Sequence, residues 1–171
     1  NMPGIEFQVE QERVPLNSNG CDKIQFLISV NPGEPAKPIA KIASGGELSR
    51  IMLAIQTVLS AHDDLDTMIF DEVDTGISGS AAQKVGLKLH EVSRYAQVIC
   101  ITHLAQIACL ADYHLLIQKQ VTENKTYTQV IPLSKEAQIK EIARMIGGQA
   151  ITPLLLQNAQ EMIDSAKQLK S

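Results

Sequence analysis

The segment "KIASGGELSR", residues 41–50, places a serine, two glycines and a glutamate directly before an amphipathic run. Free amides at the N-terminus of a helix attract anions, and glycines let an anion approach because they lack a Cβ. A candidate phosphate-binding turn is therefore formed by Ser44, Gly45, Gly46 and Glu47. The alternative is a plain capping box, in which the serine and the glutamate satisfy the first amides of the helix. A phosphate-binding loop normally carries a lysine after its glycines, and none follows here.

The segment "TMIFDE", residues 67–72, ends a short apolar run with two acids. Such a run predicts a buried strand, and ligands of α/β proteins bind beyond the carboxyl ends of the strands. There, Asp71 can hold a hydrated Mg²⁺, and Glu72 can orient or deprotonate a water for attack on a phosphorus. An acid pair after a strand is otherwise a solvated loop start, so this interpretation depends on the glycine turn that precedes it.

His103 follows a second apolar run, "VICIT", and an imidazole at that place can contact a phosphate oxygen or a bound water. A lone histidine is more often structural, so its neighbours decide its role. A zinc site built from Cys100, His103, Cys109 and His114 is the competing interpretation. It is disfavoured because the spacing matches no common zinc motif and Cys100 lies inside an apolar strand.

The patterns of apolar residues predict the elements that position these groups. An antiparallel pair is expected at residues 5–10 and 23–30, with a turn at "NSNG" and a proline-rich connector without regular structure at 31–38. The remaining predicted elements are a helix from Ser44, buried strands at 67–72 and 96–102, a helix at 81–95, a hairpin from residues 113 and 125, and helices from Ser134 and Thr152. The order strand, helix, strand, helix implies a parallel sheet with right-handed crossovers.

The composition describes one ordinary globular domain over residues 1–171, with 44% apolar residues and few aromatics. A net charge of −4 argues against a surface that binds nucleic acid as a whole. Three cysteines without CxxC spacing favour a reducing, cytoplasmic setting. We expect no membrane association, because no apolar run approaches the roughly 20 residues of a membrane helix.

Taken in order, these segments resemble the motifs of ABC-type ATPase heads, the class that includes the SMC and Rad50 proteins. "SGGE" resembles the signature motif, "MIFDE" the Walker B strand, "VDTGIS" the D-loop and "ITH" the switch-histidine segment. The resemblance runs from the first β-pair to "EIARMIGG" and so covers nearly the whole chain. It implies an α/β fold, the C-terminal lobe of an ABC-type (P-loop NTPase) head, with a mainly parallel sheet flanked by helices and additional antiparallel strands.

The same resemblance assigns roles to the motif residues. In ABC heads, the signature turn of one head contacts the γ-phosphate of ATP held by the Walker A loop of a second head, which accounts for the missing lysine. It implies ATP contact in trans by Ser44, Gly45, Gly46 and Glu47, Mg²⁺ support by Asp71, a catalytic carboxylate at Glu72 and γ-phosphate sensing by His103. The resemblance places Ser78 in the D-loop, at the position where that loop usually ends in aspartate.

A Walker A motif, G-x-x-x-x-G-K-[ST], does not occur among the ten glycines. In SMC-like proteins a long coiled coil separates the lobe that carries this motif from the C-terminal lobe. The resemblance therefore implies a fragment of a longer protein, one that is inactive alone and exposes a sheet edge or an apolar patch.

The resemblance also implies partners: the N-terminal Walker A lobe, a second head in a homodimer across ATP, and DNA through the full-length protein. The implied function is ATP hydrolysis in recombinational repair of DNA double-strand breaks, in the bacterial cytoplasm near the nucleoid. The competing function is a noncatalytic interaction domain that uses the "SGGE" surface to dock a partner.

Overall fold

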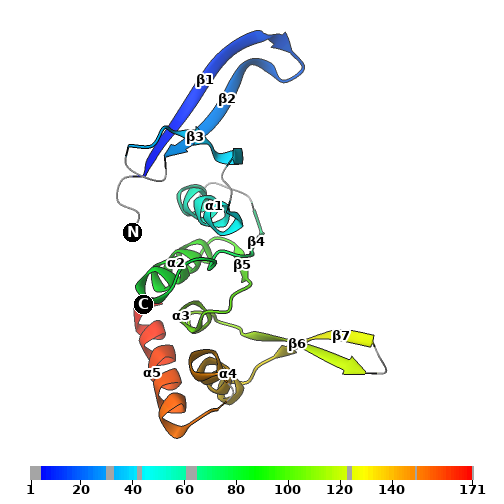
Figure 1. Ribbon diagram of the computed structural model, residues 1–171, viewed down its shortest axis with the longest axis vertical. Coiled ribbons are helices and arrows are strands. Elements are labelled where there is room, and N and C mark those ends of the chain that lie inside the picture. The colour runs from blue at the N-terminus through cyan, green and yellow to red at the C-terminus, as the bar shows by residue number, and fades with distance from the viewer. Residues whose placement is uncertain are drawn as a thin grey trace.

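The computed structural model of the chain describes residues 5–29, 33–41, 44–60, 65–122, 125–148 and 150–170. Figure 1 shows an elongated molecule with a long hairpin at one end, a body of helices around a short sheet, and two helices at the other end. A second hairpin projects sideways from this body.

The first hairpin pairs β1 (Glu6–Asn17) with β2 (Gly20–Ser29) in antiparallel register. Its turn at residues 18–19 lies within the predicted "NSNG" turn. Phe7 lies opposite Ile28 and Val9 opposite Phe26, so one face of the hairpin is apolar. The predicted antiparallel pair is confirmed, although β1 extends further along the chain than its alternating pattern indicated.

The proline-rich connector is more ordered than predicted. Strand β3 (Lys37–Pro38) pairs with Leu27 and Ile28 of β2, and a 3₁₀ turn, η1 (Ile39–Lys41), follows it. Proline is tolerated at this place because an edge strand has amides that need no partner. The prediction of no regular structure is therefore wrong for residues 37–38, while residues 30–32 lie outside the described ranges.

The central part alternates helices and strands, namely α1 (Gly45–Leu59), β4 (Thr67–Phe70), α2 (Gly79–Val92), β5 (Gln97–Cys100) and α3 (Ala105–Ala108). Strands β4 and β5 pair in parallel, which confirms the predicted arrangement. Helix α2 occupies residues 79–92 rather than 81–95, because residues 93–95 form a turn that leads into β5.

The C-terminal part contains the predicted second hairpin and two helices. Strands β6 (Leu115–Thr122) and β7 (Lys125–Pro132) pair antiparallel, and α4 (Lys135–Gly147) and α5 (Pro153–Lys170) follow. Ser134 caps α4 by accepting a hydrogen bond from the amide of Ala137 at 3.2 Å. The helix ends at Gly147, where the next residue, Gly148, takes a positive φ of 77°.

Two groups of buried side chains form the core. One lies between α1, the β4–β5 sheet and α2, and includes the fully buried Val73 and Val92. The other joins α3, α4 and α5 around the fully buried Ile142. Helix α3 contributes side chains to both groups, whereas α2 contributes to the group around the sheet and packs against the other. The two groups are therefore connected, and together they position β4 and β5.

The β4–β5 sheet is buried on one face only. Met68 and Phe70 are buried, whereas Ile69 is 67% exposed and Ile99 is 43% exposed. The prediction of fully buried strands is wrong for this second face, which carries apolar side chains although no described element covers it. Exposed apolar side chains are therefore present on this face, as expected.

The fold class is confirmed as mixed α/β, with a parallel sheet and additional antiparallel strands. The described helices include none with the length and hydropathy of a membrane span.

Candidate functional site

The N-terminus of α1 is built by the "SGGE" turn. Ser44 has an extended backbone, its Oγ accepts a hydrogen bond from the amide of Glu47 at 3.5 Å, and its carbonyl accepts one from Leu48 at 3.1 Å. Serine is a strong N-cap because its hydroxyl replaces a missing backbone acceptor. The capping role of Ser44 is confirmed, and the amides of Gly45 and Gly46 are left without an acceptor inside the helix.

Gly46 is the point at which α1 meets the loop after β4. A Cβ at position 46 would lie 2.9 Å from Thr75 Cβ and 3.0 Å from the carbonyl oxygens of Glu72 and Thr75. Since backbone carbonyls cannot swing aside, only glycine fits without a shift of the loop. The position of the glycine turn is thereby tied to the position of the two acids.

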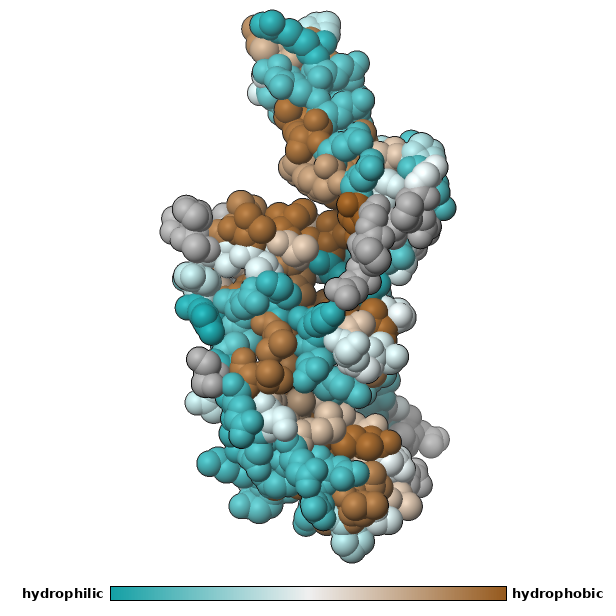
Figure 2. All heavy atoms as spheres, turned by 90° about the vertical axis from the view of Figure 1, so that its left-hand side faces the viewer, coloured by the Kyte–Doolittle hydropathy of each residue, from teal (hydrophilic) through white to brown (hydrophobic). Residues whose placement is uncertain are grey.

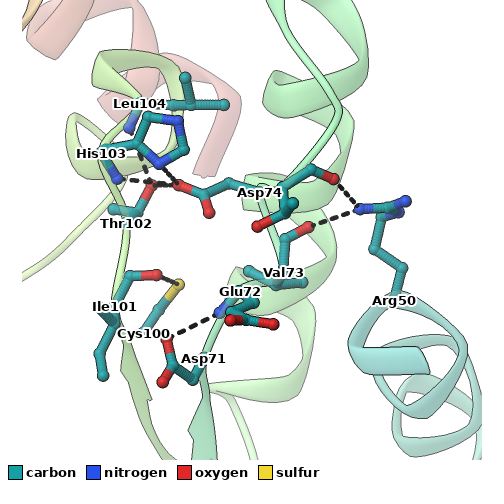
Figure 3. A network of polar contacts seen from close by, with 11 residues as sticks. Arg50, Asp71, Glu72, Val73, Asp74, Cys100, Ile101, Thr102, His103 and Leu104 are labelled. Carbon is teal, nitrogen blue, oxygen red and sulfur yellow. Dashed lines mark hydrogen bonds and ion pairs between the residues drawn. The ribbon is translucent and has the colours of Figure 1, made fainter. Parts of the chain in front are cut away.

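Two further side chains of α1 hold the same loop. The hydroxyl of Ser49 donates to the carbonyl of Asp71 at 2.7 Å. Arg50 Nη1 donates to the carbonyl of Thr75 at 2.6 Å and to that of Val73 at 3.3 Å (Figure 3). Three alternate carbonyls of the loop, at residues 71, 73 and 75, are therefore bound from one helix.

The acids Asp71 and Glu72 follow β4 directly, as predicted. Asp71 Oδ1 accepts a hydrogen bond from the amide of Glu72 at 2.8 Å. Glu72 has a φ of 58°, and it is the only non-glycine residue with a positive φ in the described part of the chain. This left-handed conformation is unfavourable for glutamate, and such strain concentrates at functional sites.

The left-handed turn directs the carboxylate of Glu72 towards the glycine turn. Oε2 lies so close to Gly45 that a Cβ there would collide with it. The structure therefore brings the predicted catalytic carboxylate and a predicted phosphate-contacting glycine together within one chain. Both side chains at the strand end are exposed, so the site is open to solvent.

Asp74 connects the loop to the segment after β5. It is 3% exposed, and its Oδ2 accepts hydrogen bonds from Thr102 Oγ1 at 2.6 Å and from the amide of His103 at 2.8 Å. The same oxygen lies 3.0 Å from His103 Nδ1, while the imidazole itself is 72% exposed (Figure 3). The amide and Nδ1 of the predicted His103 thus contact Asp74, whereas most of its imidazole ring is exposed to solvent.

Cys100 is the last residue of β5, and its thiol lies near enough to Asp74 and Asp71 to be affected by their charges. Burial, followed by the charges of Asp74 and Asp71, raises the pKa of Cys100 from its ordinary value of 9.0 to about 12. A protonated thiol is a poor nucleophile. In the described ranges no three His, Cys, Asp or Glu side chains are grouped so that they could hold a metal, which disfavours the zinc interpretation.

This raised pKa predicts a loss of stability in alkaline solution. The folded protein keeps the Cys100 proton up to about pH 12, whereas the unfolded chain releases it from about pH 9, so the free energy of unfolding falls between these values. Denaturant unfolding of the wild type and of Cys100→Ala at pH 8 and at about pH 10.5 measures this term. The wild type should lose more stability than the variant over this interval, and equal losses would contradict the assignment. Both proteins keep Cys109, whose pKa is also raised by burial.

Ser78 is separate from the other predicted residues. Its backbone is extended and its carbonyl accepts hydrogen bonds from Ala81 at 3.2 Å and Ala82 at 3.4 Å, so it caps α2 by its backbone. Its side chain is exposed and forms no capping hydrogen bond. The structure gives it no role beside the acids.

Sequence reasoning missed the residues that hold the site together, which are Ser49, Arg50, Asp74 and Thr102. Two signals were available. Asp74 is a third acid in "DEVD", and Arg50 ends the quoted "SGGELSR" segment.

No family model matches the chain. It is 49% identical over 163 residues to the DNA repair protein RecN of Bacillus subtilis and 44% identical over 168 residues to RecN of Vibrio cholerae. These matches cover 95% and 97% of this chain and 28% and 30% of the relatives. The chain resembles bacterial RecN.

Solved structures show the fold of this RecN-like segment. The Smc head domain with a coiled coil and joint derived from Pyrococcus yayanosii aligns with a TM-score of 0.58 and 23% identity, covering 82% of this chain and 26% of that one. A solved SMC ATPase structure, from work on ATP-driven dimerization and DNA-stimulated activation, aligns with a TM-score of 0.51 and 21% identity. The alignment covers 86% of this chain and 85% of that one. The segment has the fold of SMC ATPase heads, and it spans about 30% of the length of its curated RecN relatives.

Proposed function

We propose that this chain is the C-terminal lobe of the ATP-hydrolysing head of a RecN-like protein that acts in recombinational repair of DNA double-strand breaks. The observation that carries the proposal is the convergence of three predicted motifs at one edge of the parallel sheet. The "SGGE" turn, the acid pair and His103 come from three separate elements, and the loop at residues 71–75 contacts both of the others.

The acids have the arrangement that phosphoryl transfer to water requires. Asp71 uses one oxygen to accept the Glu72 amide, which orients its carboxylate, and its exposed position suits a hydrated Mg²⁺ that needs only one or two protein carboxylates. Glu72 is exposed beside it and orients the attacking water or accepts its proton. When bound, Mg²⁺ supplies neutralisation of phosphate charge.

The remaining roles concern the γ-phosphate. Ser44, Gly45, Gly46 and Glu47 form the helix end that accepts an anion, through outward amides and the positive end of the helix dipole. They serve an ATP held by a second head, in a homodimer. His103 presents its exposed imidazole to the γ-phosphate, and Ser78 has at most a minor D-loop contact.

The proposal includes partners that supply what this segment lacks. A Walker A lobe of the same protein provides the lysine-bearing cradle, and residues 1–171 form one domain beside it. The exposed side chains Ile69 and Ile99 support the existence of a covering element on the open face of the sheet. DNA is bound through the full-length protein in the bacterial cytoplasm, near the nucleoid.

The chain alone is expected to bind ATP weakly. Without Walker A amides and lysine, the triphosphate has few charge-assisted hydrogen bonds here, so we expect a dissociation constant above about 100 µM and negligible hydrolysis. Isothermal titration calorimetry of the chain with Mg·ATP measures this. Binding at micromolar concentration or below would contradict the assignment of the missing half of the site.

The test of the proposed function is ATP turnover by the full-length protein that carries this segment. Glu72→Gln keeps the shape of the side chain but removes its negative charge, and it should lower kcat by at least roughly a hundredfold. The matched control is Glu91→Gln on α2, an exposed ion-pair partner of Lys88, which should leave turnover unchanged. Retained turnover in Glu72→Gln would refute the catalytic role.

A specific observation favours the competing function of a docking domain. An apolar groove of about 560 Å³ lies between the base of the first hairpin and α1, and its lining includes Phe7, Phe26, Glu47, Arg50 and Ile51. Figure 2 shows apolar side chains gathered over this part of the molecule. If a partner bound here and its binding were insensitive to Ser44 and Glu72 variants while no ATP were hydrolysed, this second function would be supported.

A further inference from the structure

Asp74 is a buried carboxylate that no sequence motif assigned. It is 3% exposed, and three nitrogen or oxygen atoms surround its Oδ2, all of them from the segment that follows β5. Burying a carboxylate is costly unless hydrogen bonds replace its water, so these contacts are what keep Asp74 in place. Two of the three atoms belong to His103.

The contact with the ring bears on which nitrogen carries the proton. An ionised carboxylate only accepts hydrogen bonds, so the ion-pair distance of 3.0 Å between His103 Nδ1 and Asp74 Oδ2 favours a proton on Nδ1. The other nitrogen, Nε2, is then the atom at the exposed tip of the ring. It accepts a hydrogen bond when the ring is neutral and donates one when the ring is charged.

The backbone contact holds the main chain from which this ring extends. The amide of His103 donates to the same oxygen at 2.8 Å, and Thr102 Oγ1, which donates to Asp74, also accepts from the amide of Leu104 at 3.1 Å. Main chain and ring are therefore held by one carboxylate. Figure 3 shows the dashed lines from Thr102 and His103 meeting at the carboxylate of Asp74, which reaches them from the neighbouring loop.

The position of Asp74 is in turn set by α1. Arg50 binds the carbonyls of Val73 and Thr75, the residues on either side of Asp74. A continuous set of contacts thus runs from the helix of the "SGGE" turn to His103.

We propose that Asp74 is a positioning residue that holds His103 as the Nδ1–H tautomer and presents Nε2 to the γ-phosphate. The catalytic consequence rests on the proposed ATPase function, whereas the tautomer does not. Asp74 touches no reacting atom in this arrangement and acts only through His103.

The tautomer can be measured directly in the chain labelled with ¹⁵N-histidine. Long-range ¹H–¹⁵N correlation spectra, with His103→Gln for assignment, should show a proton on Nδ1 of His103 in the wild type at about pH 8. An Nε2–H tautomer in the folded wild type would overturn the proposal, whether or not any variant folds.

Asp74→Asn supplies the second measurement because its amide has the same shape but can donate a hydrogen bond to Nδ1. We expect His103 to lose the fixed Nδ1–H tautomer in this variant. Thr102→Val is the matched control, since it removes another hydrogen bond of Asp74 but leaves the contact with the ring. A tautomer that is unchanged in folded Asp74→Asn, or lost equally in Thr102→Val, would contradict the specific role of Asp74.

Turnover of ATP by the full-length protein separates this inference from the proposed function. Asp74→Asn should lower kcat at least about tenfold with little change in KM, because a misplaced Nε2 affects the reaction more than the binding. Unchanged kcat together with the predicted tautomer change would refute the catalytic part of the inference. Absence of turnover in the wild type would refute the proposed function and leave the tautomer result standing.

Discussion

Two inactive variants of the full-length protein are expected to restore ATP turnover when they are mixed. Ser44→Asp should be inactive because its charge repels a γ-phosphate, although aspartate still caps α1. Glu72→Gln should be inactive because it lacks the catalytic carboxylate. If each ATP lies between Ser44 of one head and Glu72 of the other, a mixed dimer contains one intact site and one doubly substituted site.

The expected size of the recovery follows from this symmetry. In an equal mixture half of the dimers are mixed and each has one active site of two, so turnover should reach about a quarter of the wild-type value. Ser44→Asn, which keeps the cap without the charge, should retain much more turnover than Ser44→Asp. Two different affinity tags, purified in sequence, show that mixed dimers have formed.

Failure of the mixture would have a definite structural meaning. Glu72 Oε2 lies against Gly45 within a single chain, so the two groups are also close enough to serve one nucleotide together. Mixed dimers without turnover would show that they act in cis and would refute the arrangement across a dimer.

Gly46→Ala is expected to destabilise the protein by about 1–3 kcal/mol. Alanine within a helix normally stabilises by roughly 0.5–1 kcal/mol relative to glycine, so the sign of the effect reports on the contact. Here the added Cβ would lie 3.0 Å from two carbonyl oxygens of the acid-bearing loop, and the loop must move. ATP turnover should fall with stability, because the same loop carries Glu72.

Gly45→Ala is the matched variant on the neighbouring residue. Its Cβ would meet only the end of the Glu72 side chain, which can rotate away, so the free energy of unfolding should stay within about 0.5 kcal/mol of the wild type. Denaturant unfolding of both variants tests the difference. Equal losses of stability would show that the close approach of α1 to the loop is not specific to Gly46.

Local patterns predicted those elements that local interactions determine. Ser44 and Ser134 cap their helices as expected, because capping involves only residues three apart in sequence. The hairpins were predicted for the same reason, since alternation and a turn lie within about twenty residues. The parallel pairing of β4 and β5 followed from the order of the elements and the rarity of other connections.

The sequence did not reveal the contacts between distant segments. Asp74 is 28 residues from Thr102, and Arg50 is 25 residues from Thr75, so no periodicity relates them. The burial of Ile69 was predicted wrongly for a related reason. An apolar residue in a strand indicates that some surface covers it, but the pattern does not say whether that surface belongs to the same segment. The candidate residues themselves were predicted by their motifs, whereas their mutual orientation required the fold.

The positive φ of Glu72 has a consequence for attempts to improve this protein. Glycine would adopt that backbone angle freely, so selection for thermal tolerance alone would favour replacing the glutamate. A library screened only for heat resistance should therefore accumulate well-folded molecules that have lost their chemistry, and position 72 is where that exchange would first be found.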